Sequence, residues 1–202
     1  MDAGRLDERA SLLRLVKTAA GYAWERVFSL PVQVQRSGRA NLFSRVGLGE
    51  KSVTFTLRRR PLTLHDALLW RGQHCFLTDI RELDRKYLLV EAALVRVQEC
   101  DLLEQEEAVD EYNSPRRGEA KRRFSFPGVL TEKYLRYEAG VPMAQNESLL
   151  VLVTPKAVEL DAGELVDAGG KRYAVRVRHL LDAYKNEYEI ARREDAGWRE
   201  PV

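Results

Sequence analysis

The feature that most constrains the fold of this chain is a strand hairpin that its sequence contains twice. The stretch ELVDAGGKRYAVRVRHL (residues 164–180) predicts two short strands around a Gly-Gly turn, and ALLWRGQHCFLTDIREL (67–83) has the same layout 97 positions earlier. A repeated hairpin of this kind predicts two related β modules. The function of such a chain is then sought in what paired modules do together, rather than in one catalytic pocket.

An ungapped alignment of residues 53–92 with residues 150–189 tests this repeat. It contains only five identities in 40 positions, so identity alone proves little. The matches nevertheless fall on the turn glycine and on alternating positions of the hairpin strands, which is where a repeated hairpin requires them. The identical pairs are Leu68 with Leu165, Gly72 with Gly169, Arg81 with Arg178, Leu83 with Leu180 and Tyr87 with Tyr184, and similar pairs are Phe76 with Tyr173 and Ile80 with Val177.

The remaining pattern also predicts a mainly β chain. Residues 1–35 alternate as strands do, with PVQVQ (31–35) the clearest case, and a helix over residues 6–16 is an alternative. Further strands are predicted at 52–59, 67–71, 74–80, 87–99, 149–154, 164–168, 171–179 and 186–193. Short helices are predicted at 39–47 and 130–140, each ending in glycine. We therefore expect two small antiparallel β-barrel or sandwich modules, each with a short helix.

A change of composition separates the two predicted modules. Residues 101–123 (DLLEQEEAVDEYNSPRRGEAKRR) carry an acidic block followed by a basic block, which is poor core material and predicts a charged linker or exposed arm. The expected division is a first module at 1–100, a linker at 101–123 and a second module at 124–202. The basic end of the linker either contacts DNA phosphates or pairs with its acidic neighbour or an adjacent subunit, and we favour the second interpretation.

Composition limits the class of protein. The chain is 45% hydrophobic, which is enough for real cores, and no apolar run approaches the roughly 20 residues that a membrane-spanning helix needs. The start, MDAGRLDERASLL, has acidic residues where a secretion signal would be basic, so no such signal is expected. Cys75 and Cys100 lack metal-ligand spacing and are expected to be a reduced pair.

The net charge of +2 conceals a difference between the two halves. Residues 1–100 contain 17 Lys and Arg against 11 Asp and Glu, which gives +6, and residues 101–202 contain 16 against 20, which gives −4. A molecule that is electrically two-ended can orient identical copies head to tail, or it can give one end an affinity for another partner such as nucleic acid.

No pattern in the sequence predicts an enzyme or a cofactor. His65, His74 and His179 have no partner at the spacing of a nucleophile, a base or a metal site, and the short motifs of hydrolases, nucleotide-binding proteins and zinc peptidases are absent. His74 and Cys75 are adjacent on a predicted strand and would face opposite sides. The aromatic residues are predicted to be packing residues rather than a platform for stacked bases: Trp24, Trp70, Phe76 and Tyr173.

Two longer stretches resemble a known family. The strand SVTFTLRR, the hairpin ALLWRGQHCFLTDI and the strand after it are similar to phage head-tail joining proteins, also called head closure or head-tail adaptor proteins, and ASLLRLVK and YAWERVFSLPVQVQ stand where that family has its first strand and its tryptophan segment. The stretch TPKAVELDAGELVDAGGKRYAVRVRH looks like a related minor capsid or neck protein. Together the resemblance spans most of residues 5–97 and 126–193.

This resemblance implies a structural protein of a tailed-phage or prophage particle, assembled in the bacterial cytoplasm and located in the neck of the virion. It implies no enzymatic activity, no cofactor and no membrane partner. The implied partners are other copies of the chain in a ring of six or twelve, the portal or adaptor protein, tail proteins and the DNA that passes through the channel. Family members are usually single modules, so a tandem pair leaves the ring symmetry open.

The candidate contact residues are basic side chains in the predicted loops and linker, which would face neighbouring subunits or the channel. They are Arg36, Arg39, Arg45, Arg58, Arg59, Arg60, Arg116, Arg117, Lys121, Arg122 and Arg123. A small nucleic-acid-binding β-barrel and a tail-completion protein are the alternative functions. Basic and aromatic residues on one shared face would favour nucleic-acid binding.

Overall fold

The computed structural model describes residues 6–40, 50–109, 115–134, 148–179 and 182–193, and every regular element in these ranges is a β-strand. The predicted mainly β fold is therefore confirmed. The strands are β1 (Glu8–Thr18), β2 (Gly21–Ala40), β3 (Glu50–Arg58), β4 (Ala67–Trp70), β5 (Gln73–Leu83), β6 (Tyr87–Val95), β7 (Gln98–Val109), β8 (Pro115–Tyr134), β9 (Ser148–Pro155), β10 (Leu165–Ala168), β11 (Lys171–His179) and β12 (Lys185–Arg192).

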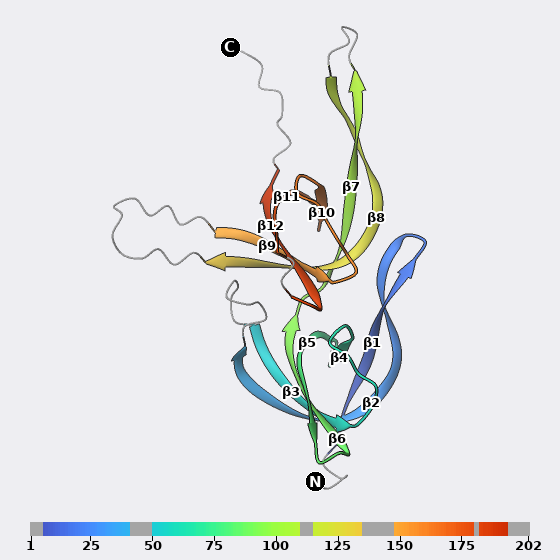
Figure 1. Ribbon diagram of the computed structural model, residues 1–202, viewed down its shortest axis with the longest axis vertical. Coiled ribbons are helices and arrows are strands. Elements are labelled where there is room, and N and C mark those ends of the chain that lie inside the picture. The colour runs from blue at the N-terminus through green and yellow to red at the C-terminus, as the bar shows by residue number, and fades with distance from the viewer. Residues whose placement is uncertain (1–5, 41–49, 110–114, 135–147, 180–181, 194–202) are drawn as a thin grey trace, which may run out of the picture.

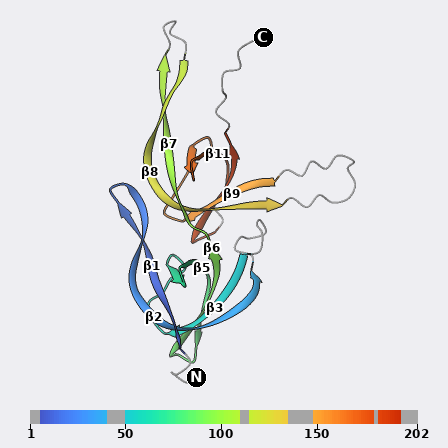
Figure 2. The same ribbon diagram turned by 180° about the vertical axis from the view of Figure 1, so that it is seen from behind.

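Each half of the chain closes into a barrel of six antiparallel strands (Figures 1 and 2). In the first barrel the order β1-β2-β3-β6-β5-β4 returns to β1. The second barrel has the corresponding order, β7-β8-β9-β12-β11-β10, and returns to β7. Closure pairs the two edges of each sheet with one another, so the modules are barrels rather than sandwiches.

Alternation along the strands gives each barrel its own core. The first core contains large side chains such as Phe55 and Leu68, and the second contains Phe126, Leu152 and Tyr188, all fully buried. A six-stranded barrel has room inside only for side chains, so these residues fill the two interiors. The centre of each barrel is thus a packed core and not a channel.

The two barrels share their strand irregularities as well as their strand order. The pairing of β1 with β2 shifts between Leu12 and Leu13, and that of β7 with β8 shifts between Leu102 and Leu103. A second shift follows Leu77 in β5 and Val175 in β11. Because a bulge at a given position is a specific feature of a sheet, its recurrence at matching places supports an internal repeat.

The structure corrects the register of that repeat. The hairpin turn of the first barrel has Arg71 and Gly72 at φ of 49° and 76°, and the turn of the second has Gly169 and Gly170 at 63° and 76°. Gly72 therefore corresponds to Gly170, 98 positions later, and not to Gly169. The predicted offset of 97 holds for β3 and β9, where Phe55 corresponds to Leu152. The loop after β9 has one residue more than the loop after β3, so the offset is 98 from β4 and β10 onward.

This one-residue difference matters because a slip by one position moves every side chain of a strand to the other face. In the corrected register Cys75 corresponds to Tyr173, and both lie inside their barrels. The alignment based on identities had paired Tyr173 with Phe76, which points outward. Most of the identical pairs after residue 67 are thus coincidental, although the repeat that they suggested is present.

Two other predictions are wrong where the structure describes the residues. Residues 101–109 and 115–123 are not a linker between the modules, because they belong to β7 and β8, whose hairpin projects from the second barrel as the arm that the sequence also allowed (Figure 1). The connection between the barrels is the short segment between β6 and β7. Residues 6–16 fall in the extended N-terminal segment that contains β1, so the alternative helix is absent. Of the helix predicted at 130–140, residues 130–134 are strand because they belong to β8. Of the helix predicted at 39–47, residues 39 and 40 are strand because they belong to β2. The other residues of both segments lie outside the described residues.

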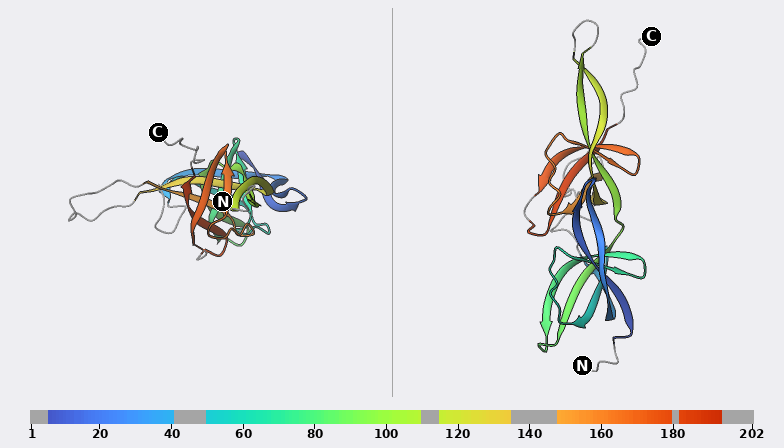
Figure 3. Two further views of the ribbon diagram at one scale, coloured as in Figure 1. Left: turned by 90° about the horizontal axis from the view of Figure 1, so that it is seen from above. Right: turned by 90° about the vertical axis from the view of Figure 1, so that its right-hand side faces the viewer.

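A long hairpin extends from each barrel, as Figure 3 shows from the side. The β1-β2 hairpin of the first barrel lies against the second, where Gly21 of β2 pairs in parallel with Ser125 of β8. The Ser125 amide donates a 2.8 Å hydrogen bond to the Ala20 carbonyl, and the rings of Tyr22 and Phe124 meet edge to face at 6.1 Å. The β7-β8 hairpin projects from the second barrel in the corresponding direction (Figure 1).

Replacing Gly21 by alanine is expected to detach this hairpin from the second barrel. A Cβ atom at Gly21 would lie 1.9 Å from the Ser125 carbonyl oxygen, and the φ of +138° is itself unfavourable for alanine. We expect a loss of at least about 2 kcal/mol of unfolding free energy in urea and faster hydrogen exchange of the Ser125 amide. Gly72→Ala is the control, because it has positive φ in open space and should cost about 1 kcal/mol. Equal losses would contradict the contact.

Candidate functional site

The most distinctive site in the molecule is the junction between the two barrels, where an apolar cluster joins their outer surfaces. We call the first barrel's side face A, formed by outward residues of β1, β4, β5 and β6, and the second barrel's side face B, formed by outward residues of β8 and β9. The buried members of the cluster are Leu13, Ala67, Phe76, Ala93 and Val95 on face A, and Val129, Val151 and Val153 on face B.

Burial at this junction is as complete as in a barrel core. Val151 and Val153 are 1% and 0% exposed, and Trp24 and Leu69 pack against the cluster from the first barrel. Burying large apolar side chains on both sides gives a stable contact between the barrels. Because face A and face B are different surfaces of the same kind of barrel, the contact is heterologous, or head to tail.

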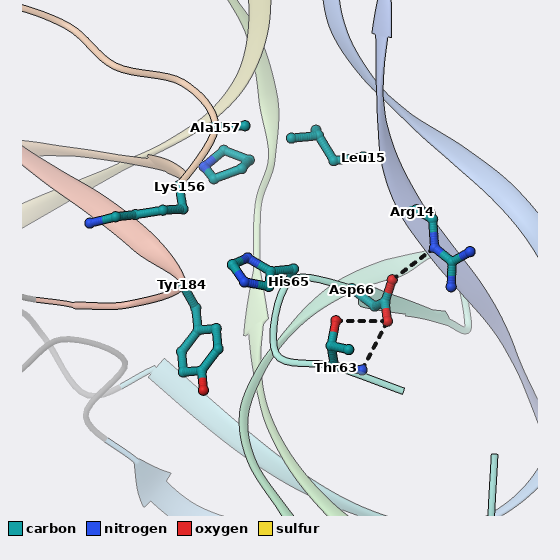
Figure 4. Close-up of a pocket in the computed structure, with 9 residues that line it drawn as sticks. Arg14, Leu15, Thr63, His65, Asp66, Lys156, Ala157 and Tyr184 are labelled. Atoms are coloured by element: carbon teal, nitrogen blue, oxygen red, sulfur yellow. Dashed lines mark hydrogen bonds and ion pairs between the residues drawn. The ribbon is translucent and has the colours of Figure 1, made fainter. Parts of the chain in front are cut away.

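A cleft of about 400 Å³ lies beside this cluster, between the same two faces. Figure 4 shows the residues that line it, with His65 and Asp66 from the first barrel opposite Lys156 and Tyr184 from the second. The rings of His65 and Tyr184 meet edge to face at 5.0 Å between centroids. The cleft is therefore bounded on both sides by polar groups.

The acidic group of the cleft has a structural role. Asp66 accepts hydrogen bonds from the Thr63 amide at 2.9 Å and the Thr63 hydroxyl at 3.1 Å, and from Arg14 at 3.2 Å (Figure 4). The second barrel repeats this turn, where Glu164 accepts a 2.7 Å hydrogen bond from the Asp161 amide. A carboxylate therefore closes the same turn in both barrels. Because three donors already hold Asp66, its role is to fix the loop.

The histidine in the junction lies between two aromatic side chains. His74 packs on face A between Trp24 and Phe76, with ring centroids 5.2 Å apart in each case. Burial lowers the pKa of His74 from 6.5 to about 4, and within the described structure its Nε2 atom has no hydrogen-bond partner. Cys75 points into the barrel core on the opposite side, as the strand alternation predicted. Both cysteines are buried free thiols, and burial raises the pKa of each to about 12.

The predicted basic contact residues lie in separate places. Arg36 is exposed and lies 5.9 Å from the centroid of the Trp70 ring. Arg39 is in β2 and Arg45 lies outside the described residues. At the end of β3 and just after it, three exposed arginines follow one another: Arg58, Arg59 and Arg60.

The rest of the basic residues belong to β8, in the hairpin at the opposite end of the molecule from the end of β3 (Figure 1). Arg116 and Arg117 lie in its outer part, and Lys121, Arg122 and Arg123 are exposed nearer the barrel. The register places acidic β7 opposite basic β8, with Glu104 facing Lys121 and Glu107 facing Arg117 along the backbone. The acidic and basic blocks are therefore cross-strand neighbours along the backbone.

The apolar junction residues were not predicted as a site, although one signal was present. A strand with one face in solvent alternates, but LLVLV (149–153) is apolar at every position, which is typical of a strand that is buried on both faces. In the structure Leu152 points into the second core while Val151 and Val153 form face B. The partner surface on face A has no comparable run.

Comparisons with known proteins found no match to this chain among protein-family models, curated proteins or solved structures. In the described part of the chain, no helix could span a membrane. No group of three or more His, Cys, Asp or Glu residues in that part is placed to hold a metal ion.

A charged side chain in the junction is expected to separate the barrels. Val153→Asp would bury an unpaired carboxylate in the apolar cluster, at a cost of about 3 kcal/mol or more. We expect calorimetry to show two unfolding transitions in place of one, and small-angle scattering to show a larger radius of gyration. The control is Val153→Thr, because threonine occupies the corresponding position of the first barrel, Thr56. A single unchanged transition in Val153→Asp would contradict the role of the junction.

His74 is expected to make the junction sensitive to acid. Because its pKa is lower in the folded chain than its ordinary value, the unfolded chain takes up a proton first as the pH falls below about 6.5. Stability present above that pH is lost between 6.5 and 4, and about 2 to 3 kcal/mol should be lost by pH 4.5. Urea unfolding at several pH values should show this loss in the wild type but not in His74→Leu. His65→Leu, at an exposed histidine, is the control, and parallel pH profiles for wild type and His74→Leu would exclude the effect.

Proposed function

We propose that this chain is a structural connector of a tailed-phage or prophage particle. Copies form a ring at the neck of the virion, between the portal and head on one side and the tail on the other. The partners are other copies of the chain, the portal or adaptor protein and tail proteins, with genomic DNA passing through the ring. The role requires specific contacts between proteins and no chemical step.

The observation that carries this proposal is the head-to-tail contact between two barrels of the same fold. Faces A and B are complementary but not identical, and repeated contacts of this type generate a closed ring when the rotation between units is suitable. The contact already exists once inside the chain, at the apolar junction. The two long hairpins extend the reach of each barrel beyond its own body (Figure 3).

The resemblance to head closure proteins supports the same function. It rests on the strand and hairpin of the first module and the hairpin of the second, and these segments form corresponding strands of the two barrels: β3 to β5, β10 and β11. A connector must also let DNA pass without binding it tightly. In the β7-β8 hairpin an acidic strand pairs with a basic one, so the hairpin has little net charge and would not hold passing DNA tightly.

Nucleic-acid binding by the barrels is less well supported. Its expected sign was a face shared by basic and aromatic side chains, but Trp70 and Tyr173 are 3% and 5% exposed in the barrel cores, and Phe76 is covered by the junction. The interpretation of these aromatic residues as packing residues is confirmed. A direct test of nucleic-acid binding is still needed, because the exposed residues Arg58, Arg59 and Arg60 could contact phosphates.

The proposal predicts that the purified chain forms a ring, or a complex of fixed stoichiometry, with the portal protein of the same genome. Light scattering gives the mass, and negative-stain imaging gives the shape, of the chain alone and mixed with the portal. A chain that stays monomeric at high concentration and ignores the portal would exclude the connector function. If that monomer also shifted short duplex DNA in a salt-dependent way, the nucleic-acid-binding alternative would replace it.

A further inference from the structure

We propose that neighbouring copies join by repeating the contact between the two barrels of one chain. We call the surface of the second barrel that corresponds to face A its A-type face, and the surface of the first barrel that corresponds to face B its B-type face. The A-type face of the second barrel would dock on the B-type face of the first barrel in the next copy. Each barrel uses only one of its two faces within the chain, and the charged edges of the other two faces are exposed, although Thr56 and Leu165 at their centres are 2% and 6% exposed. The inference rests on the proposed function in that it names the contact by which the connector would assemble.

Corresponding positions in the two barrels define these faces. Main-chain hydrogen bonds fix the correspondence around the cleft, since the Arg59 amide donates to the Lys86 carbonyl at 2.8 Å and the Lys156 amide donates to the Tyr184 carbonyl at 3.1 Å. Arg59 thus takes the place of Lys156, and Lys86 that of Tyr184. The pairing of β3 with β6 has the same register as the pairing of β9 with β12, so each outward residue of one barrel can be matched to a residue of the other.

The A-type face of the second barrel carries three carboxylates along the edge that corresponds to the cleft, and arginines of the same barrel pair with two of them, Arg123 with Glu164 and Arg178 with Asp161. In the first barrel that edge is formed by Arg14, Thr63 and Asp66. The matching residues are Glu104, Asp161 and Glu164. Glu104 is exposed, and the side chain of Asp161 is 77% exposed although it pairs with Arg178.

The B-type face of the first barrel is basic along the matching edge. Where the second barrel presents Pro155, Lys156, Ala157 and Tyr184 to the cleft, the first barrel has Arg58, Arg59, Arg60 and Lys86. All four of these basic residues are exposed, and Arg59 pairs with Glu82 at 2.8 Å. The carboxylates on the edge of one copy and the basic residues on the edge of the next are therefore complementary in charge.

The centre of this contact is less apolar than the junction inside the chain. The second barrel offers Leu103, Leu165, Ala174, Ala191 and Arg193 where the first has Leu13, Ala67, Phe76, Ala93 and Val95. The first barrel offers Gln33, Thr54 and Thr56 where the second has three valines. We therefore expect a weaker, salt-sensitive contact between copies, which forms after each chain has docked its own two barrels.

The hairpins fit the same arrangement. The β1-β2 hairpin contacts Phe124 and Ser125 of the second barrel, and the matching residues of the first barrel are Phe28 and Ser29. In the repeated contact, the β7-β8 hairpin of one copy would lie along this part of β2 in the next. The Arg60 guanidinium lies 5.2 Å from the centroid of the Phe28 ring, so it lies where the acidic strand β7 of that hairpin could meet it.

Paired charge reversals test this contact. One variant carries Arg58→Glu and Arg60→Glu, which makes the basic edge acidic, and the other carries Glu104→Lys and Asp161→Lys, which makes the acidic edge basic. Sedimentation velocity at low ionic strength, over a series of concentrations, measures self-association. Each variant alone is expected to associate at least about tenfold more weakly than the wild type, because like charges then meet at every contact.

An equal mixture of the two variants is expected to recover association to within about threefold of the wild type, since the reversed edges match when the variants alternate. This recovery also shows that both variants are folded. Arg176→Glu, a charge reversal at an exposed residue of β11 that is not one of the edge residues named above, is the control and should associate as the wild type does. Association of each variant that equals the wild type, or a mixture without recovery, would overturn the proposed contact.

Two further outcomes separate this inference from the connector function. Oligomers that depend on the two edges but do not bind portal would support the contact and exclude the connector. Oligomers that bind portal but ignore both charge reversals would support the connector and exclude the contact. If Arg58→Glu with Arg60→Glu instead abolished salt-dependent binding of short duplex DNA while self-association was unchanged, the basic edge would be a DNA contact and the inference would be wrong.

Discussion

The apolar contact between Val151 and Val153 of the second barrel and the outer face of the first is the interaction on which the rest of this structure depends. Each barrel has its own core, so closure of the sheets does not by itself fix how the barrels are arranged. The junction does so, because it buries large side chains from both. The cleft, the position of the first hairpin and the separation of the acidic and basic edges follow from that single contact.

The two barrels are alike inside and different outside. Strand order, bulges and the carboxylate that closes one turn, Asp66 or Glu164, recur in both. The outward residues have diverged, with valines on one B-type face and Gln33, Thr54 and Thr56 on the other. Core positions are held by packing, whereas outer positions change freely unless they meet a partner. The divergence therefore marks one face as a permanent contact and leaves its counterpart suited to a reversible one.

Much of the fold was predictable from local pattern. The hairpin turns at Gly72 and Gly170, the β-branched strands and the presence of a repeat followed from residue types alone. The register of the repeat did not, because an offset chosen by identity was wrong by one residue after an inserted loop position. The charged stretch at residues 101–123 predicts a linker or exposed arm, because charge patterning cannot distinguish a solvated segment from a two-stranded hairpin whose acidic and basic strands pair.

What the sequence by itself determined is which segments are strands, where the tight turns fall and that the chain contains two modules, because alternation and turn chemistry act over a few residues. Contacts between distant residues determined that each sheet closes on itself, that His74 packs between Trp24 and Phe76 at the junction and that basic and acidic residues lie on two separate edges. These features depend on contacts between residues far apart in the chain. The outer face of a strand shows in sequence that it is apolar or charged, but not which surface it will meet.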